Sequence, residues 1–174
     1  GLAARLRLGR VGPGLSVPCV PFASRDGRAG SVPATTRLLR CETMSNPLLR
    51  VVDLHAAATE CHRHGLKLVV DNTFATPVLT RPLSYGADLV LHSVTKYLAG
   101  HSDVTAGAVV ARPPEDAARL RPVRCVVGRT PSPMATWLAV AATQNLPPRV
   151  APPPQQPRAG GRVQEPVIIP ALTA

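Results

Sequence analysis

Aromatic residues make up only 3% of this 174-residue sequence. Proteins that recognise single-stranded nucleic acid stack bases on aromatic side chains, and no RNA-binding signature is present here. The formal net charge of +10 arises at the two ends, because residues 41–112 carry six basic and six acidic side chains. The arginines at the ends show no helical periodicity. We therefore expect no nucleic-acid partner, although charge alone keeps a basic nucleic-acid-binding protein as an alternative.

Paired cysteines and long apolar runs are also missing. The four cysteines lie far apart and form no Cys-x-x-Cys pair, so neither a disulfide framework nor a zinc knuckle is indicated. The run from Cys61 to His64 invites a zinc interpretation, but on a helix these side chains point in different directions. No apolar run approaches the ~18 residues that a membrane-spanning helix requires. We expect no bound metal, no membrane partner and a location in the cytoplasm.

Lysine is rare, since only Lys67 and Lys96 are found among the 20 lysines and arginines. A sequence that uses arginine for almost every positive charge retains lysine where amine chemistry is needed. Guanidinium stays protonated, whereas an amine can lose its proton and attack a carbonyl. Lys96 ends the motif Ser93-Val94-Thr95-Lys96 after an apolar run, so it is a candidate catalytic residue.

Proline and glycine divide the chain into three parts. Residues 1–34 show no sustained period of two or 3.6 and predict an irregular N-terminal segment. Residues 35–143 carry the periodic segments and predict one α/β domain. Residues 144–174 predict a proline-rich irregular tail, because residues 147–170 contain eight prolines.

The periodic part predicts alternating strands and helices. The run Leu66–Val70 is continuously apolar, which is typical of a buried parallel strand. Asp53 predicts the start of a helix that ends near Gly65, and Pro122 is expected to kink or split a second helix. The expected strands are 37–42, 66–70, 88–92 and 107–111, and the expected helices are 53–65 and 114–127. This order predicts an α/β sheet of largely parallel strands.

Chemically capable side chains follow two of these strands. In open α/β sheets ligands bind beyond the carboxyl ends of the strands, where Asp71 and the segment Ser93–Lys96 are expected. A carboxylate can pair with a protonated ring nitrogen, two hydroxyls can hold a phosphate, and a lysine can form a Schiff base. Together these groups match the requirements of pyridoxal phosphate. Taken singly, Asp71 also suits a turn, Lys96 a solvated surface, and both hydroxyls a hydrogen bond to backbone.

A second enzyme class shares the motif Ser-x-x-Lys, namely the serine β-lactamases and penicillin-binding proteins. Their mechanism also requires Ser-Asp-Asn and Lys-Thr-Gly elements. Here Ser102-Asp103-Val104 lacks the asparagine and no Lys-Thr-Gly is present. This alternative is therefore disfavoured.

Three stretches resemble one known family from about Thr35 to about Val140. They are ETMSNPLLRVVDL, VVDNTFATPVLTRPLSYGADLVLHSVTKYLAGHSDVTAG and GRTPSPMATWL. They are similar to the cystathionine γ-synthase, cystathionine γ-lyase and O-acylhomoserine sulfhydrylase family of Cys/Met metabolism. The resemblance implies the large domain, in part, of the aspartate-aminotransferase-like fold, which is fold type I of the pyridoxal-phosphate enzymes.

The resemblance also implies roles for five residues. Lys96 would form the Schiff base with pyridoxal 5'-phosphate and carry protons, and Asp71 would keep the pyridine nitrogen protonated. Ser93 and Thr95 would bind the phosphate, and Asn46 would lie near the ring hydroxyl. The implied reaction is γ-replacement or γ-elimination on a small amino-acid substrate, a homoserine ester or cystathionine, in an enzyme that is usually a homotetramer.

The two ends depart from the family pattern. Residues 1–34 show no convincing cofactor-stacking tyrosine or glycine-containing phosphate loop, and the chain turns proline-rich from Gln144. We therefore expect a chain truncated at both ends. A catalytically inactive remnant is the alternative to an active enzyme.

Overall fold

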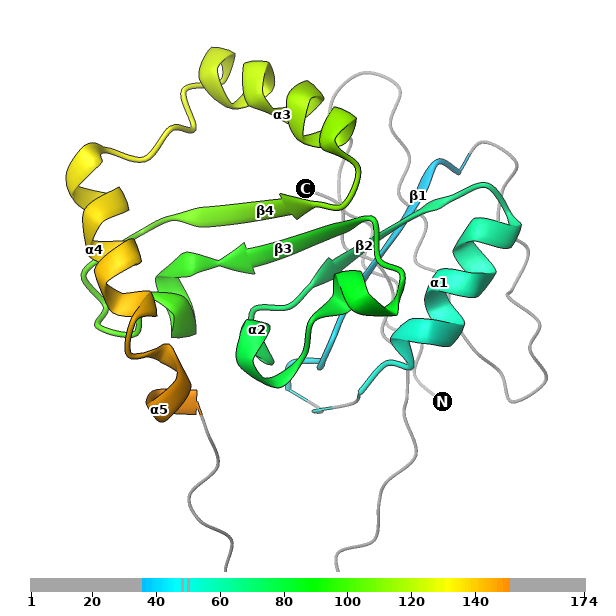
Figure 1. The fold of residues 1–174 in the computed structure, drawn as a ribbon, viewed down its shortest axis with the longest axis horizontal. Helices are drawn as coiled ribbons and strands as arrows, with labels where there is room; N and C mark the ends of the chain where they lie inside the picture. Colours follow the sequence, from blue (N-terminus) through cyan, green and yellow to red (C-terminus); the bar gives the residue numbers. More distant parts are fainter. Residues whose placement is uncertain (1–35, 48, 50, 151–174) are drawn as a thin grey trace, which may run out of the picture.

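The computed structural model describes residues 36–47, 49 and 51–150. The elements in chain order are β1 (Leu38–Glu42), α1 (Leu54–Arg63), β2 (Lys67–Asp71), α2 (Thr76–Leu79), the 3₁₀ turn η1 (Pro82–Tyr85), β3 (Leu89–Ser93), the π-helical turn η2 (Val94–Leu98), β4 (Gly107–Ala111), α3 (Pro114–Val126), α4 (Pro133–Thr143) and α5 (Leu146–Val150). The four expected strands are all present, shifted by one residue at most (Figure 1).

The strands form one mixed sheet in the order β1-β2-β3-β4. β1, β2 and β3 are parallel, and β4 runs antiparallel to β3. The expectation of a largely parallel α/β sheet with flanking helices is confirmed. The chain reverses direction through η2 and the loop that follows it. It then returns beside β3, so β4 pairs with β3 in the antiparallel sense (Figure 1).

The main core lies between the sheet and α1. Asp53 caps the helix, because its Oδ1 accepts a hydrogen bond of 3.0 Å from the N–H of Ala56. The buried face of α1 is Leu54, Ala57, Ala58 and Cys61, spaced as one side of a helix requires. Leu68, Val70 and Val90 of the sheet complete this cluster.

Cys61 is therefore a core residue. Burial raises the pKa of its thiol to about 12, and the nearby Asp88 carboxylate adds to the shift. His62 Nε2 lies 3.1 Å from Asp88, while His64 Nε2 lies 3.0 Å from Glu60. The run that invites a zinc interpretation thus separates into a core cysteine and two contacts between a histidine and a carboxylate, and no group of three possible metal ligands occurs among the described residues.

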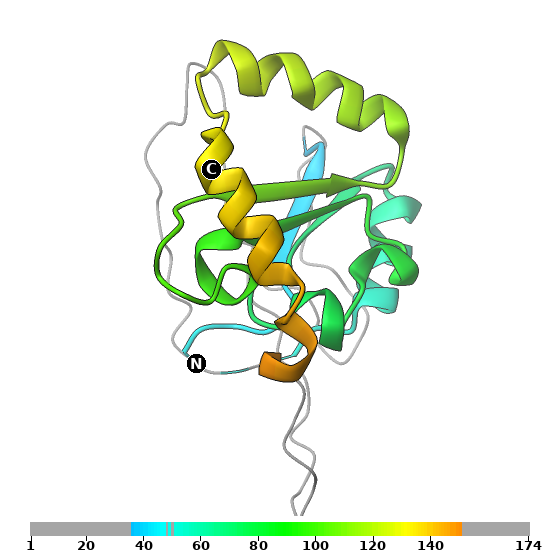
Figure 2. The same cartoon turned by 60° about the vertical axis from the view of Figure 1, so that its left-hand side comes forward.

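The C-terminal half of the described chain is more helical than its sequence predicts. α3 runs through Pro122 without a split. Its proline is exposed, so the carbonyl that loses an intrahelical donor can face water. Ser132 caps α4, because its Oγ accepts a 3.1 Å hydrogen bond from the N–H of Ala135. Leu138 and Ala139 of α4 belong to the same apolar cluster as Val94 of η2 and Ala108 of β4. Figure 2 shows α4 crossing over β4.

α5 lies in the segment that we expected to be irregular. Its first residue, Leu146, is only 4% exposed, and burial of this side chain anchors the helix. The predicted irregular segments 1–34 and 151–174 lie outside the described residues. Within the described part of the chain, every helix is too short or too polar to cross a membrane.

We predict that Leu68→Ala lowers the free energy of unfolding by about 2–5 kcal/mol, because it leaves a cavity at a side chain that is 0% exposed. Leu79→Ala is the matched control, since Leu79 is 53% exposed and its loss should cost within about 0.5 kcal/mol. Urea unfolding followed by circular dichroism measures both variants. Equal costs for the two would contradict the assigned core.

Candidate active site

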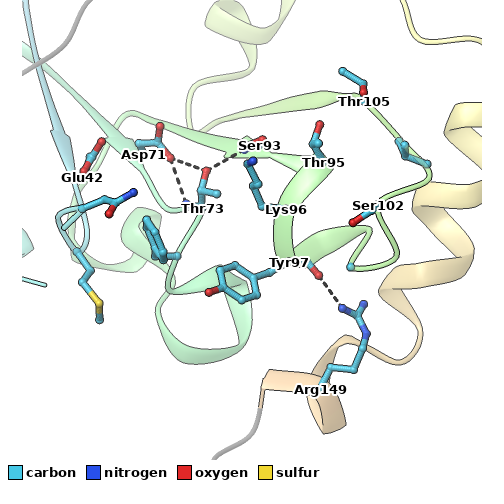
Figure 3. Close-up of a pocket in the computed structure, with 15 residues that line it drawn as sticks. Glu42, Asp71, Thr73, Ser93, Thr95, Lys96, Tyr97, Ser102, Thr105 and Arg149 are labelled. Atoms are coloured by element: carbon cyan, nitrogen blue, oxygen red, sulfur yellow. Dashed lines mark hydrogen bonds between the residues drawn. The ribbon is translucent and has the colours of Figure 1, made fainter.

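A cavity of about 950 Å³ opens at the carboxyl ends of β2 and β3 (Figure 3). The site residues expected from the sequence all line it: Asn46, Asp71, Ser93, Thr95 and Lys96. The fold brings them together because β2 and β3 are parallel neighbours, so that their ends meet at one edge. Sequence reasoning missed other lining residues, among them Glu42, Thr73, Phe74 and Arg149.

Asp71 is held from two sides. Its Oδ2 accepts a 2.9 Å hydrogen bond from Nη2 of Arg40, with which it forms an ion pair. Its Oδ1 accepts from the backbone N–H of Thr73 at 3.2 Å and from the Thr73 hydroxyl at 2.6 Å. A carboxylate with this many donors is fixed in orientation. The two-residue spacing of an acid and a threonine after a strand is typical of an Asx turn and could have identified Thr73.

Thr73 also connects the ends of the two strands. Its Oγ1 accepts a 2.9 Å hydrogen bond from the backbone N–H of Ser93. Asp71, Thr73 and Ser93 therefore form one chain of hydrogen bonds across the floor of the cavity (Figure 3). The Ser93 hydroxyl makes no hydrogen bond within the described part of the chain and is available to a ligand.

Lys96 lies in η2, directly after β3. Its backbone, at φ −87° and ψ −119°, departs from helical values and interrupts the turn. Hydrogen bonds of 2.8 Å from Ala99 N–H to the Val94 carbonyl and from Gly100 N–H to the Lys96 carbonyl close the turn around it. The Lys96 side chain is exposed to the cavity and projects toward the strand ends in Figure 3.

Thr95 joins the lysine turn to β4. Its hydroxyl lies 3.2 Å from the carbonyl oxygen of Ala106 and accepts a 3.0 Å hydrogen bond from the Ala106 N–H. The backbone interaction considered for this hydroxyl from the sequence is therefore present. Its role as a phosphate ligand stays a prediction, and a phosphate would have to share or displace the Ala106 contact.

The cavity carries a second carboxylate at Glu42, which pairs in register with Asp71. Burial raises the pKa of Glu42, and the neighbouring Asp71 raises it further. Arg40 and the backbone N–H of Asn46 oppose this shift. On the other side of the sheet, burial lowers the pKa of His92, and the negative charge of Asp71 partly opposes this shift.

An aromatic pair lines another part of the cavity. The ring centroids of Phe74 and Tyr97 lie 6.0 Å apart, with the ring planes inclined at 54°. Such surfaces suit a planar ligand. The cavity therefore offers an amine, two carboxylates, a free hydroxyl and an aromatic wall. These are groups that suit the aldehyde, ring nitrogen, phosphate and ring of pyridoxal phosphate, and the cavity of about 950 Å³ is large enough to hold it.

Comparison with known sequences identifies the family. A sequence model described as Cys/Met metabolism PLP-dependent enzyme matches residues 12–156. The chain belongs to this family. The family depends on PLP, pyridoxal 5'-phosphate, so the expected cofactor class and enzyme class are confirmed at the level of the family. The match extends beyond the expected limits of Thr35 and Val140 at both ends.

Curated relatives of the Cys/Met metabolism family carry several reaction names. A probable cystathionine gamma-synthase of Herpetosiphon aurantiacus is 38% identical over 133 residues, which are 76% of this chain and 42% of that protein. Cystathionine gamma-lyase of Dictyostelium discoideum is 41% identical over 127 residues, which are 73% of this chain and 33% of that protein. Cystathionine beta-lyase of Lactococcus lactis subsp. cremoris is 38% identical. The chain spans less than half the length of these relatives.

Solved structures share the fold. Cystathionine gamma-lyase from Lactobacillus plantarum, complexed with L-serine, has a TM-score of 0.65 and 37% identity, over 67% of this chain and 30% of that one. Cystathionine gamma synthase from Xanthomonas oryzae pv. oryzae, in complex with aminoacrylate and cysteine, has a TM-score of 0.62 and 47% identity, over 63% and 28%. The expected fold-type I assignment for this part of the chain is confirmed.

We predict that Glu42→Gln stabilises the protein increasingly as pH rises. The fold raises the pKa of Glu42 above its ordinary value of 4.5, so the native state favours the protonated form. The stability that protonated Glu42 contributes is fully present below pH 4.5, and it is lost as pH rises through the pKa of Glu42 in the folded state. Thermal unfolding midpoints at about pH 4 and about pH 7 measure the effect.

The uncharged amide should raise the midpoint at the higher pH and change it little at the lower. Glu115→Gln, at an exposed position in the first turn of α3, is the control for removal of one negative charge. A constant difference between Glu42→Gln and the parent protein at both pH values would contradict the assignment.

Proposed function

We propose that this protein is a pyridoxal-phosphate-binding enzyme of sulfur amino-acid metabolism. Its reaction would be γ-replacement or γ-elimination on a homoserine ester or cystathionine. The observation that carries the proposal is the Lys96 amine in one cavity with Asp71, Ser93, Thr95 and Asn46. The reaction names of the relatives, γ-synthase, γ-lyase and β-lyase, support the substrate class.

The residues of the cavity divide into holding groups and proton-transfer groups. Lys96 Nζ would hold the cofactor covalently through its aldehyde carbon and then carry protons to and from the substrate. Asp71 would face the pyridine nitrogen, with its orientation fixed by Arg40 and Thr73. When bound, the cofactor supplies an electron sink for the bond that breaks at the substrate α-carbon.

The phosphate would be held at the start of η2. The free hydroxyl of Ser93 and the hydroxyl of Thr95 flank the lysine there. Asn46, on the loop after β1, would donate to the ring hydroxyl. Phe74 and Tyr97 provide an aromatic surface on which a planar ring could pack.

We further propose a cytoplasmic location and an assembly of several copies of the chain. The free, buried thiols of Cys41 and Cys61 suit a reducing compartment. The exposed apolar side chains of Met134, Trp137 and Val140 on α4 suit a covered surface. Light scattering of the purified chain measures its mass, and a monomer at micromolar concentration would exclude the assembly.

We predict that borohydride reduction after incubation with pyridoxal phosphate fixes one pyridoxyl phosphate group on Lys96. Lys96→Arg keeps the positive charge and should abolish the label, because guanidinium does not condense with the aldehyde. Lys67→Arg is the matched control at the other lysine and should keep the label. Intact-protein mass and peptide mapping measure both. A parent chain without label, or with its label at Lys67, would contradict the proposal and favour an inactive remnant.

We predict that Asp71→Asn retains the covalent label at Lys96 but lowers the rate of substrate turnover by about 10²-fold or more. Asparagine keeps the size and accepting oxygen of the side chain, so the Thr73 contact can persist, but it lacks the negative charge. Release of the α-keto acid from L-cystathionine measures the rate. An unimpaired rate in Asp71→Asn would remove this residue from the mechanism.

A further inference from the structure

Arg149 of α5 reaches across the chain to the turn that carries Lys96. Its Nη1 donates a 2.8 Å hydrogen bond to the carbonyl of Tyr97, and its Nη2 lies 3.3 Å from the carbonyl of Leu98. Nη2 also donates at 2.8 Å to the carbonyl of Ala142 in α4. One guanidinium thus joins η2, α4 and α5.

The carbonyls bound by Arg149 are those that the lysine turn leaves open. Backbone N–H groups occupy the carbonyls of Val94 and Lys96, as the 2.8 Å bonds from Ala99 and Gly100 show. The next two carbonyls, at Tyr97 and Leu98, would need water or a side chain, as at any helix end. The planar fork of arginine satisfies both at once, which the point charge of lysine does less well.

A hydrogen bond between Arg149 of α5 and Asn145, the residue that precedes this helix, orients the guanidinium of Arg149. Nε of Arg149 donates a 2.8 Å hydrogen bond to Oδ1 of Asn145, one helical turn earlier. Leu146 beside it is buried and fixes α5 against the domain. Figure 3 shows Arg149 on the far side of η2 from the Asp71 network, so it holds the turn without facing that carboxylate.

Gly100 provides the space for this contact. A Cβ at this position would lie 2.0 Å from Nη1 and 2.8 Å from Cζ of Arg149. Gly100 also has φ +73°, a left-handed conformation that ends the turn and that other residues adopt at a cost. The sequence therefore combines a helix-ending glycine and an arginine donor at the same point.

We propose that Arg149 is a positioning residue that holds the Lys96 turn in the conformation presenting the amine to the cavity. The proposal rests on the proposed function of Lys96 as the cofactor-binding amine. Arg149 acts through the backbone of Tyr97 and Leu98 and takes no part in bond making. Loss of its fork would loosen the turn on the carboxyl side of Lys96 and slow capture of the cofactor.

The first experiment compares Arg149→Ala with Arg149→Lys, and with Arg121→Ala as the control. Arg121 is exposed on α3. Figure 1 shows this helix on the opposite side of β4 from β3 and the turn that follows it. In the chain without cofactor, hydrogen exchange of the segment 94–100 should be about five- to tenfold faster in Arg149→Ala, as expected for loss of one or two hydrogen bonds. Arg149→Lys should fall between Arg149→Ala and the parent, and Arg121→Ala should match the parent.

The same variants are then tested for cofactor capture well below their unfolding midpoints. The rate of borohydride-trapped labelling at Lys96 should fall in Arg149→Ala and recover in part when methylguanidinium is added. A variant that is less stable but labels Lys96 at the parent rate would overturn the positioning role. Unchanged hydrogen exchange in segment 94–100 would overturn it equally.

A second experiment measures the coupling between Gly100 and Arg149. Gly100→Ala should lower the unfolding midpoint more than Gly128→Ala, since Gly128 has φ +69° but no atom within 4 Å of an added Cβ. In the Arg149→Ala background the two glycine substitutions should cost about the same, because only the conformational cost remains. An excess cost for Gly100→Ala that persists in that background would overturn the contact.

The two proposals fail in different ways. If the parent chain takes no label at Lys96, the cofactor proposal fails, while hydrogen exchange and the Gly100 coupling still report on the turn. If the parent takes the label and Arg149→Ala takes it at the same rate, the cofactor proposal stands and the positioning role fails.

Discussion

Parallel pairing of β2 with β3 determines where the candidate active site lies. Val70 lies beside Val90 and Asp71 beside Leu91, so both strands end at the same edge of the sheet. Hydrogen bonds through Thr73 then fasten the two ends to each other. A slip of one residue in this register would turn Asp71 to the opposite face and separate it from Ser93. The acid, the hydroxyls and the lysine are close in space only because this pairing is exact in register.

Charge around the cavity is balanced within a small volume. Two carboxylates, at Glu42 and Asp71, are adjacent across β1 and β2. Arg40 forms an ion pair with Asp71, and its positive charge also lowers the pKa of Glu42. Asp71 is therefore paired with a cation, while burial and the proximity of Asp71 raise the pKa of Glu42. The core between the sheet and α1 is apolar instead, with Leu68 and Val70 of β2 packed in the same cluster as Ala57 and Ala58 of α1.

The sequence was most informative where local pattern and tertiary packing agree. The apolar strands and the helix face of Leu54, Ala57 and Cys61 have periods that only one packing satisfies. That Asp71, Ser93, Thr95 and Lys96 share one cavity could be predicted, because they lie at the ends of two neighbouring parallel strands or directly after them. Their roles stay predictions. Helix α5 could not be predicted, since it contains two prolines and is stabilised by the buried Leu146 and by contacts with distant residues. Helix α4 was missed although Ser132 and Pro133 are typical of a helix start. Arg149 carried no signal for its contact with the lysine turn, because the carbonyls of Tyr97 and Leu98 lie 52 and 51 positions earlier.

The contact between Arg149 and the lysine turn has a consequence for how the protein is made. Tyr97 and Arg149 are 52 positions apart. At about 5–20 residues per second, the ribosome synthesises Arg149 about 3 to 10 seconds after Tyr97. The strands and the lysine turn therefore leave the ribosome before the side chain that completes them. Maturation of the site is delayed until nearly the whole described chain has been translated.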